Sequence, residues 1–596
     1  MSVYTEQIES ETKTPQTLVM RSLPWVITLV AGLICYGLFY NRSVWLSVIG
    51  YSISPAERVL QGEVPYRDFL YNYTPGILWL NAFLMKILGT NLLTVHLGLF
   101  AFKLATLLVL YLVARKLVGQ WFGLIPVALT LSWIGYKYIF GVFPTQYSML
   151  FVLFGIYSML RFDEREKTIW LLACGLSVGA VFLFKYNVGI LLFGAATLIV
   201  FIKQLTISNK SLGQRLIHTF KIAAIFWLGF AMALAPLIYY LVKHQALQAM
   251  INHFLHHASA YSGERAVALP GLKWLIPVIA GLMVVSGVGV VVARKTLKYF
   301  NAFVGMVVLV AGAVLFYPNR AFIIKNSAMA TVAYLPLFLF FAIAIGLLIS
   351  YWFLIRNSLS TGKAKSLTNK REWWTYNRQV IIVGLFALGA YLEIYPRADY
   401  YHVIRALPPT FLLMTLLLVK AVPILQEMFS AQSPLLKPAI YRVIGAVVML
   451  FGFVGVQNSW LPNFDAKFRF IDRAAVNIER AQGILVPPKQ AEFIEQLTQA
   501  IQSNSSPDDY IFSFGQRGAG FYFLAGRPNP TKFVWWRNVG ISKADREAVI
   551  QMLNEKRAKL ILLQDSLKDA RVREAVAANY HQVGWVSGIA IYDRNT

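Results

Sequence analysis

Two short polar stretches hold the side chains that could do chemistry in this otherwise apolar chain. The first, residues 56–76, contains three carboxylates and two arginines: Glu57, Glu63, Asp68, Arg58 and Arg67. The second, residues 395–402, contains Arg397, Asp399 and His402. Ionisable groups beside a membrane are costly and usually functional, and carboxylates and histidine are the common proton-transfer groups. We therefore expect the two stretches to meet on one face of the protein and to form a site for acid–base chemistry.

The elements that must position these stretches are membrane helices. The chain has 596 residues, of which 57% are hydrophobic, and a mean hydropathy of +0.56. Such a chain is too apolar for a soluble globular protein, and its apolar runs reach membrane-spanning length. Its formal charge of +27 comes from basic clusters between the runs, as the positive-inside rule expects, which argues against a nucleic-acid partner. Both cysteines, Cys35 and Cys174, lie inside apolar runs, so no disulfide framework is predicted.

The order of apolar runs predicts a polytopic α-helical membrane protein with three parts. Residues 1–22 form a cytoplasmic amino terminus, and residues 23–460 form a membrane domain of about thirteen spans. Its first outer loop, residues 41–92, includes a short apolar helix over 76–89 that lies on or dips into the membrane surface. Residues 461–596 form an α/β domain on the outer face.

The pattern of the tail, residues 461–596, alternates between helix and strand periods. Helices are predicted over 490–501 and 543–553, and strands over 510–514 and 560–563. The glycine cluster at 515–520 does not have the spacing of either standard phosphate-binding loop, so we interpret it as a turn. The tail is expected to cover the outer cavity and to help select an acceptor.

The positions of the carboxylates favour chemistry at the outer surface. Six acidic residues outside the tail are predicted on that side: Glu57, Glu63, Asp68, Glu264, Glu393 and Asp399. None is predicted near the middle of the membrane, where ion-coupled transporters place ionisable groups. The distribution therefore argues against an ion-coupled transporter.

Four motifs in order resemble the GT-C superfamily of polyprenyl-phosphate-sugar-dependent glycosyltransferases. Residues 65–76 (PYRDFLYNYTPG) resemble the start of its first outer loop, and 184–189 (FKYNVG) resemble its Phe-Lys-Gln-Asn-x-Gly element. Residues 396–402 (PRADYYH) resemble an Arg-x-Asp-x-x-His loop, and 521–530 (FYFLAGRPNP) resemble a Tyr-Phe-Leu-Ala-Gly-Arg segment. The closest group is that of bacterial aminoarabinose transferases and protein-mannosyltransferase-like enzymes. One departure is Val48-Ile49, where many members carry an acidic residue.

The resemblance implies transfer of a sugar from a polyprenyl phosphate to a lipid, glycan or protein acceptor, by a single inverting displacement in a bacterial inner membrane. Asp68 beside Arg67 is then the predicted base, and Asp399 with His402 is the alternative base or a positioning pair. Glu57 is a further catalytic candidate. The predicted substrate-binding residues are Tyr66, Arg67, Lys185, Arg320, Lys325 and Arg397, the last four as phosphate ligands at outer helix ends.

Simpler structural interpretations stand beside each of these roles. Asp68 could form a local ion pair with Arg67 or cap a turn, Lys185 could extend to the membrane boundary, and His402 could bond only to its own loop. His253 and His257 share a helix face, but without a nearby cysteine they favour a solvated surface helix over a metal site. No cofactor is predicted, although the resemblance allows a divalent cation.

Two other classes remain open from the sequence. A lipid or polysaccharide transporter would bind the same amphiphiles without breaking a bond, and a non-catalytic envelope-assembly protein would use the tail for protein contacts. The carboxylates distinguish the three, because only an enzyme needs the charge of Asp68 or Asp399.

Overall fold

The computed structural model describes residues 18–134, 141–207, 211–264, 271, 320–359, 363–395, 398–430, 436–459, 472–534, 536, 543–564 and 569–595. The amino-terminal half contains α2 (Leu18–Gly37), α3 (Leu46–Val48), the π-helical turn η1 (Ile49–Ile53), α4 (Ser54–Leu60), α5 (Gly76–Leu88), α6 (Leu92–Val118), α7 (Leu124–Trp133), α9 (Pro144–Arg165), α10 (Thr168–Phe184), α11 (Tyr186–Ile207), α12 (Leu212–Lys243) and α13 (Leu247–Glu264). The rest of the membrane domain contains α16 (Arg320–Leu359), α17 (Lys363–Tyr391), η3 (Leu392–Ile394), α18 (Tyr400–Ala406), α19 (Pro408–Ser430) and α20 (Leu436–Ser459).

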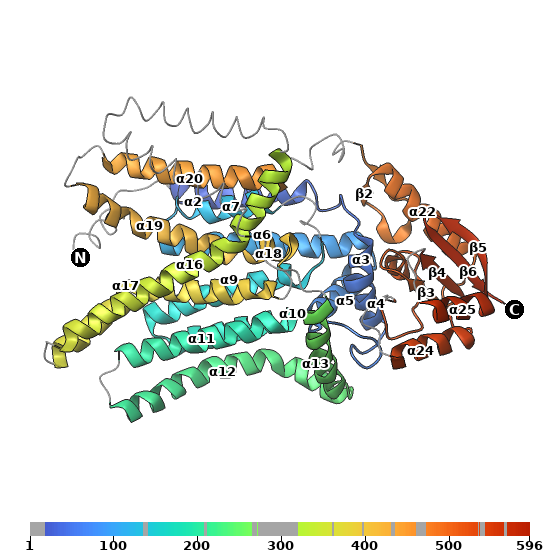
Figure 1. Cartoon of the computed structure of the whole chain (residues 1–596), viewed down its shortest axis with the longest axis horizontal. Coiled ribbons are helices and arrows are strands. Elements are labelled where there is room, and N and C mark those ends of the chain that lie inside the picture. The colour runs from blue at the N-terminus through green and yellow to red at the C-terminus, as the bar shows by residue number, and fades with distance from the viewer. Residues whose placement is uncertain are drawn as a thin grey trace.

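The tail begins after these helices. It contains β1 (Ala474–Ala475), η4 (Glu479–Ala481), β2 (Leu485–Val486), α22 (Pro488–Ser503), β3 (Ile511–Phe514), η5 (Gly518–Gly520), α23 (Phe521–Leu524), α24 (Lys543–Asn554), β4 (Leu560–Gln564), α25 (Ala570–Asn579), β5 (Tyr580–Val586) and β6 (Ile589–Arg594). Figure 1 shows the long helices running side by side, with the sheet at one end of the bundle beyond α3, α4 and α5.

The membrane architecture agrees with the sequence prediction. Among the described residues, α6, α11, α12 and the segment Lys370–Ile394, which combines most of α17 with η3, are long and apolar enough to cross a membrane. Seven shorter apolar helices accompany them. The chain is therefore a polytopic α-helical membrane protein with a carboxy-terminal α/β unit. The number of thirteen spans stays a prediction, and two of the predicted spans, 274–293 and 301–316, lie outside the described residues.

Glycines let α10 and α12 approach closely. A Cβ atom on Gly175 of α10 would collide with the Phe226 carbonyl oxygen of α12, and one on Gly229 would collide with the Leu172 carbonyl oxygen. In lipid there is no hydrophobic drive between helices, so close backbone packing at small residues supplies much of the association.

A buried ionic cluster joins three helices at the opposite end of the bundle from the tail. Asp163 of α9 accepts hydrogen bonds from Trp374 Nε1 at 2.9 Å and Arg378 Nη1 at 3.0 Å, both on α17. Lys203 Nζ of α11 lies 3.3 Å from the same carboxylate. Because both charged partners are supplied, Asp163 can be buried there without a large desolvation cost.

The tail forms a four-stranded sheet of order β3-β4-β6-β5, in which only the β3–β4 pair is parallel. Side chains alternate between its two faces. Phe512 and Ile561 point to the face that packs with α24 and α25, whereas Ile511, Leu560 and Leu562 belong to the core shared with the membrane domain. The predicted helices and strands of the tail all occur, within a few residues of the expected bounds.

The tail is docked on the first outer loop at several points. Glu57 of α4 is 8% exposed, and its Oε1 accepts a hydrogen bond from Arg480 Nη1 at 2.5 Å. Leu70 N donates to the Lys532 carbonyl oxygen at 2.8 Å. Gly520 of the glycine cluster lies so close to Leu46 that a Cβ there would be 2.8 Å from its carbonyl oxygen. The cluster is thus a short 3₁₀ turn fitted against the loop.

We expect Arg480→Ala to loosen this docking. Burial raises the pKa of Glu57 although Arg480 opposes the shift, so loss of Arg480 makes the carboxyl group easier to protonate, which limits the damage. The expected loss of stability is about 2 kcal/mol, less than the several kcal/mol typical of a broken, fully buried pair. Limited proteolysis should release the tail faster and thermal unfolding should begin earlier.

The matched control is Arg571→Ala, which breaks a pair with Glu547 on the exposed surface of the same tail. This variant should unfold and be cleaved like the wild type. Equal behaviour of the two variants would mean that the Glu57–Arg480 pair does not hold the tail in place.

Candidate functional site

A buried ion pair lies where α9, the α10–α11 junction and η3 meet. Lys185 Nζ is 2.9 Å from Glu393 Oε2 and 3.0 Å from Thr145 Oγ1, and Thr145 Oγ1 also donates to the Glu393 carboxylate. The side chains of Lys185 and Glu393 are 5% and 1% exposed. Lys185, predicted as a phosphate ligand, therefore has a carboxylate partner in this structure.

Asp399 and His402 form a second pair at the start of α18. Asp399 Oδ1 accepts from the His402 backbone N–H at 3.1 Å, which caps the helix, and lies 2.8 Å from His402 Nδ1. An ionised carboxylate can only accept, so Nδ1 carries the hydrogen and Nε2 keeps its lone pair. Burial, with the nearby charges of Lys185 and Arg405, lowers the pKa of His402 below its ordinary value, although Asp399 opposes the shift. His402 is therefore a neutral imidazole oriented to accept a proton at neutral pH.

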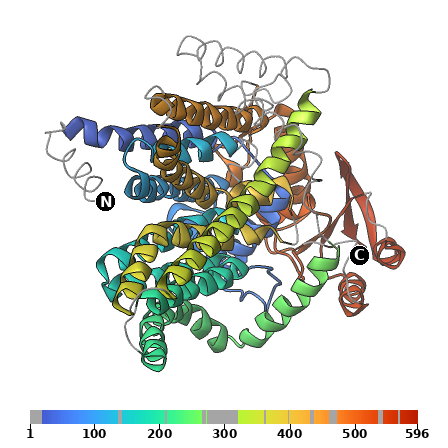
Figure 2. The same cartoon turned by 60° about the vertical axis from the view of Figure 1, so that its left-hand side comes forward.

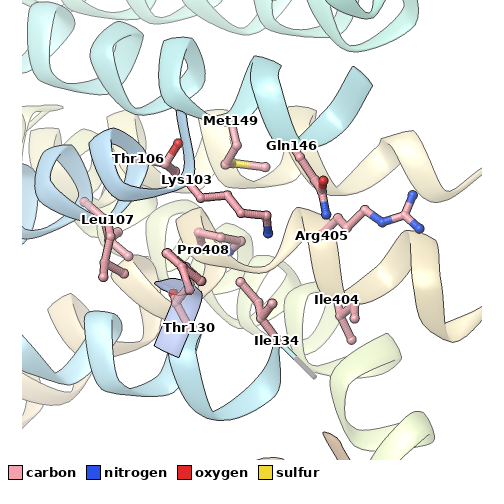
Figure 3. Close-up of a pocket in the computed structure, with 12 residues that line it drawn as sticks. Lys103, Thr106, Leu107, Thr130, Ile134, Gln146, Met149, Ile404, Arg405 and Pro408 are labelled. Carbon is pink, nitrogen blue, oxygen red and sulfur yellow. The ribbon is translucent and has the colours of Figure 1, made fainter. Parts of the chain in front are cut away.

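A small cavity beside α18 has mostly apolar walls and includes two cationic residues, Lys103 and Arg405, in its lining. It has a volume of about 40 Å³, which is room for about three water molecules. Its lining residues come from α2, α6, α7, α9, α18 and α19 and include Lys103, Gln146, Ile404 and Arg405. In Figure 3 the Lys103 ammonium group extends into the space beneath Gln146, while the Arg405 guanidinium group is directed away from Lys103. Arg405 lies over the Phe143 ring at 3.7 Å.

Lys103 is the unusual member of this set. It is 6% exposed and lies within the apolar helix α6, and its ammonium group is 5.3 Å from the centre of the Tyr36 ring. In the described part of the chain, no carboxylate lies within 4 Å of Lys103 Nζ, whereas Lys185 and Lys203 each have one. A lysine buried without a counter-charge is costly to keep charged, and a bound anion would supply the missing charge.

The first outer loop holds Asp68 in a local structure of its own. Asp68 Oδ2 accepts from the Val64 backbone N–H at 2.7 Å, and its two oxygens bind Arg67 Nε and Nη2 at 2.8 Å. The hydrogen bond from Arg67 is the main reason why the pKa of Asp68 is lowered. The carboxylate thus makes both the local ion pair and the turn cap that the sequence offered as structural alternatives.

Tyr66, predicted to bind substrate, has a left-handed backbone with φ of 70°, which is uncommon for a residue with a side chain. Its hydroxyl donates to the Tyr73 carbonyl oxygen at 2.5 Å, and its ring packs edge-to-face on Phe254 of α13 at 5.6 Å. Tyr73 in turn lies 6.0 Å from Lys185 Nζ. Through these contacts Tyr66 links the first outer loop and α13 to Tyr73, which lies near the buried Lys185–Glu393 pair.

The remaining predicted residues fall into two groups. Arg320 begins α16 and Lys325 lies in its first turns, but the positions of their side chains and the whole of Arg397 lie outside what the structure describes. Glu57 forms the ion pair with Arg480 that docks the tail. His253 Nε2 lies 3.1 Å from Asn72 Oδ1, the side chain of His257 is outside the description, and the described residues contain no group of three metal-binding side chains.

Sequence reasoning missed Lys103, Gln146 and Arg405, and it counted Glu393 among the outer acids without giving it a role. A signal for Lys103 was present, because a lysine in the middle of an apolar run is as unusual as an acid there. The search for charges within the membrane had considered acids alone.

A comparison with protein-family models matches part of the chain. A family model described as dolichyl-phosphate-mannose-protein mannosyltransferase matches residues 72–232. This match confirms the predicted resemblance for a segment that includes the end of the first motif and all of the second. A comparison with curated protein sequences yields no match.

Two solved structures align with most of the chain at low similarity. The crystal structure of ArnT from Cupriavidus metallidurans bound to undecaprenyl phosphate has a TM-score of 0.46 and 13% identity, and the alignment covers 97% of this chain and 98% of ArnT. The oligosaccharyltransferase of Archaeoglobus fulgidus, in complex with zinc and sulfate, has a TM-score of 0.44 and 13% identity, covering 95% of this chain and 73% of that protein. Because both similarities are low, we infer the function from this chain's own residues.

The two buried lysines should respond differently to the same substitution. Lys185→Met would leave Glu393 buried without its partner and should cost about 3–5 kcal/mol of stability. Lys103→Met removes a cation that has no carboxylate beside it and should leave stability unchanged or raise it. Thermal unfolding of the two variants in detergent tests this directly, and an equal fall for both would contradict a ligand-binding role for Lys103.

Proposed function

We propose that this protein is a membrane glycosyltransferase that moves a sugar from a polyprenyl phosphate carrier to an acceptor hydroxyl outside the cytoplasm. The observation that carries the proposal is the ammonium group of Lys103, buried beside a small, mostly apolar cavity without a carboxylate partner in the described structure. A phosphate ester is the anion that fits a cation within apolar helices, because the chain attached to it can remain in lipid. The family match over residues 72–232 supports the same class of donor, since its description names a lipid-phosphate-linked sugar.

The base in this proposal is His402, the second of the two bases considered from the sequence. The acceptor hydroxyl gives its proton to His402 Nε2 as its oxygen attacks the anomeric carbon. The bond between that carbon and the phosphate oxygen breaks, and the configuration inverts. Asp399 keeps the imidazole in the correct tautomer and stabilises the imidazolium that forms.

Cations then stabilise the leaving group. Negative charge grows on the phosphate as the bond breaks, and prearranged positive groups in a water-poor site are worth more there than in water. Ile404 and Arg405, one turn after His402 on α18, line the cavity that contains Lys103. The same short helix would therefore carry the base and form one wall of the cavity into which Lys103 extends.

Asp68 takes a supporting role in this scheme. Its carboxylate is already engaged by Arg67 and the Val64 N–H, and its lowered pKa makes it a weak base. We propose that it shapes the first outer loop around the acceptor. The finer placement has the amino terminus in the cytoplasm and the tail outside a bacterial inner membrane, and it belongs to this proposal. The orientation is supported by the basic inner segments, and the bacterial membrane is what the family resemblance implies.

The proposal is tested in cells that lack the protein and are complemented with variants. Mass spectrometry should show that Lys103→Met and His402→Ala accumulate a carrier-linked sugar and lose one envelope glycan, as the deletion does. His581→Ala, in the tail and far along the chain from the site, is the control and should restore the wild-type profile.

Two other outcomes would change the assignment. If Asp68→Asn alone loses the glycan while His402→Ala is active, the base is Asp68. If every variant restores the glycan at normal expression, the protein is not a transferase, and transport or assembly remains.

The pH dependence of turnover provides a separate prediction. Activity needs the neutral imidazole, so the acid limb of kcat should reflect the lowered pKa and lie below pH 6.5, the ordinary value. Asp399→Asn removes an interaction that raises this pKa, so it should move the limb to still lower pH while reducing kcat. A limb that stays in place in Asp399→Asn would argue that the histidine is not the titrating base.

A further inference from the structure

A second cavity lies far from the catalytic candidates, between α11, α16 and α17. Its volume is about 380 Å³, within the size range of sites that hold small molecules. Its walls are almost entirely apolar and include Ile202 of α11, Ile343 and Ala344 of α16, and Ile381 of α17. Figure 2 shows α16 and α17 running beside each other across the front of the bundle.

The dimensions of this cavity fit one leaflet of a bilayer. On α17 its lining residues run from Trp373 to Leu385, which is about 18 Å at 1.5 Å per residue. Half of a hydrocarbon core of about 30 Å has a similar depth. The occupant that fits this space is an apolar chain that ends within one leaflet. Leu348 of α16 lines the cavity and is 69% exposed, so it faces the lipid from which this chain would enter.

One end of the cavity is polar and aromatic. Tyr351 and Trp373 meet there edge-to-face at 5.3 Å, and Trp373 Nε1 donates to Ser350 Oγ at 2.8 Å. Tryptophan and tyrosine typically mark the level of lipid headgroups. The apolar part of the cavity thus lies within the membrane, and its polar end lies at the interface.

The sequence beside that polar end is basic. Residues 363–378 contain five basic residues and one acid, in order Lys363, Lys365, Lys370, Arg371, Glu372 and Arg378. Arg378 is engaged by Asp163, but Arg371 is exposed and Lys370 is half-buried. Basic side chains at the end of a groove between membrane helices suit an anionic headgroup.

We propose that this cavity is a binding site for an anionic phospholipid, with one hydrocarbon chain between α11, α16 and α17 and the phosphate at the basic start of the membrane-spanning part of α17. The site is independent of the sugar-transfer proposal and lies at the same end of the bundle as Asp163. A bound lipid would fill a space that would otherwise separate α16 from α11.

Native mass spectrometry of the full-length protein, exchanged into phosphatidylglycerol or phosphatidylcholine, tests the site. The wild type should retain one phosphatidylglycerol at least about fivefold more than phosphatidylcholine, as expected when several basic residues attract the headgroup. Ala344→Phe places a ring in the cavity and should remove the retained lipid. Ala342→Phe makes the same change two residues earlier, on the exposed side of α16, and should keep it.

Gly384→Ala and Arg371→Gln keep the test decisive if Ala344→Phe does not fold. A methyl group on Gly384 would meet only ordinary contacts, at 3.8 Å from Ile343, so the protein should fold with a smaller cavity and weaker retention. Arg371→Gln should reduce the preference for phosphatidylglycerol without removing the chain. Equal retention of both lipids by the wild type, or unchanged retention in both folded variants, would overturn the proposal.

Discussion

The cost of placing a charge where water is scarce governs this structure. Lys185 with Glu393 and Lys203 with Asp163 each place a charged pair inside the bundle, near its two ends. The Lys185–Glu393 pair joins segments 208 positions apart, and the Lys203–Asp163 pair joins α11 to α9, 40 positions apart. In each pair the partner offsets the cost of burying the charge. The helices are therefore held in register by a few ionic contacts, while apolar side chains fill the space between them. Lys103 differs from Lys185 and Lys203 because no carboxylate lies beside it in the described structure. This difference distinguishes a lysine suited to binding a ligand from the two that have a structural role.

The same constraint explains why the candidate site lies at the ends of long helices. There, short elements such as η3 and α18 interrupt the long helices and bring backbone and side-chain polar groups together. His402 is shielded enough for burial to lower its pKa, yet a fifth of its side chain remains exposed. A proton acceptor needs this intermediate position, because a fully buried imidazole would not reach a substrate and a fully solvated one would be partly protonated.

Much of the architecture could be predicted from the sequence because periodicity and hydropathy act locally. The helices around 145–160 and 168–184, and the tail elements around 490–501 and 560–563, all occur close to the predicted bounds. The partners of charged residues could not be predicted, because pairing depends on how helices face one another. Lys185 and Glu393 are separated by 208 positions, and nothing local in either segment indicates the other. Asp68 illustrates the opposite case, since its binding to Arg67 and Val64 is local and had been considered from the sequence.

The contact between the first outer loop and the tail has a consequence for how the protein is made. Glu57 and Arg480 are 423 positions apart, so at about 5–20 residues per second the loop waits about 20 to 85 seconds for its partner to be synthesised. During that interval the docking surface of the loop is uncovered. A chain that stops before the tail would contain every span and the side chains of the candidate site, but its loop would lack the surface against which it is fixed. Folding of the first outer loop is thus completed only after the tail has been synthesised.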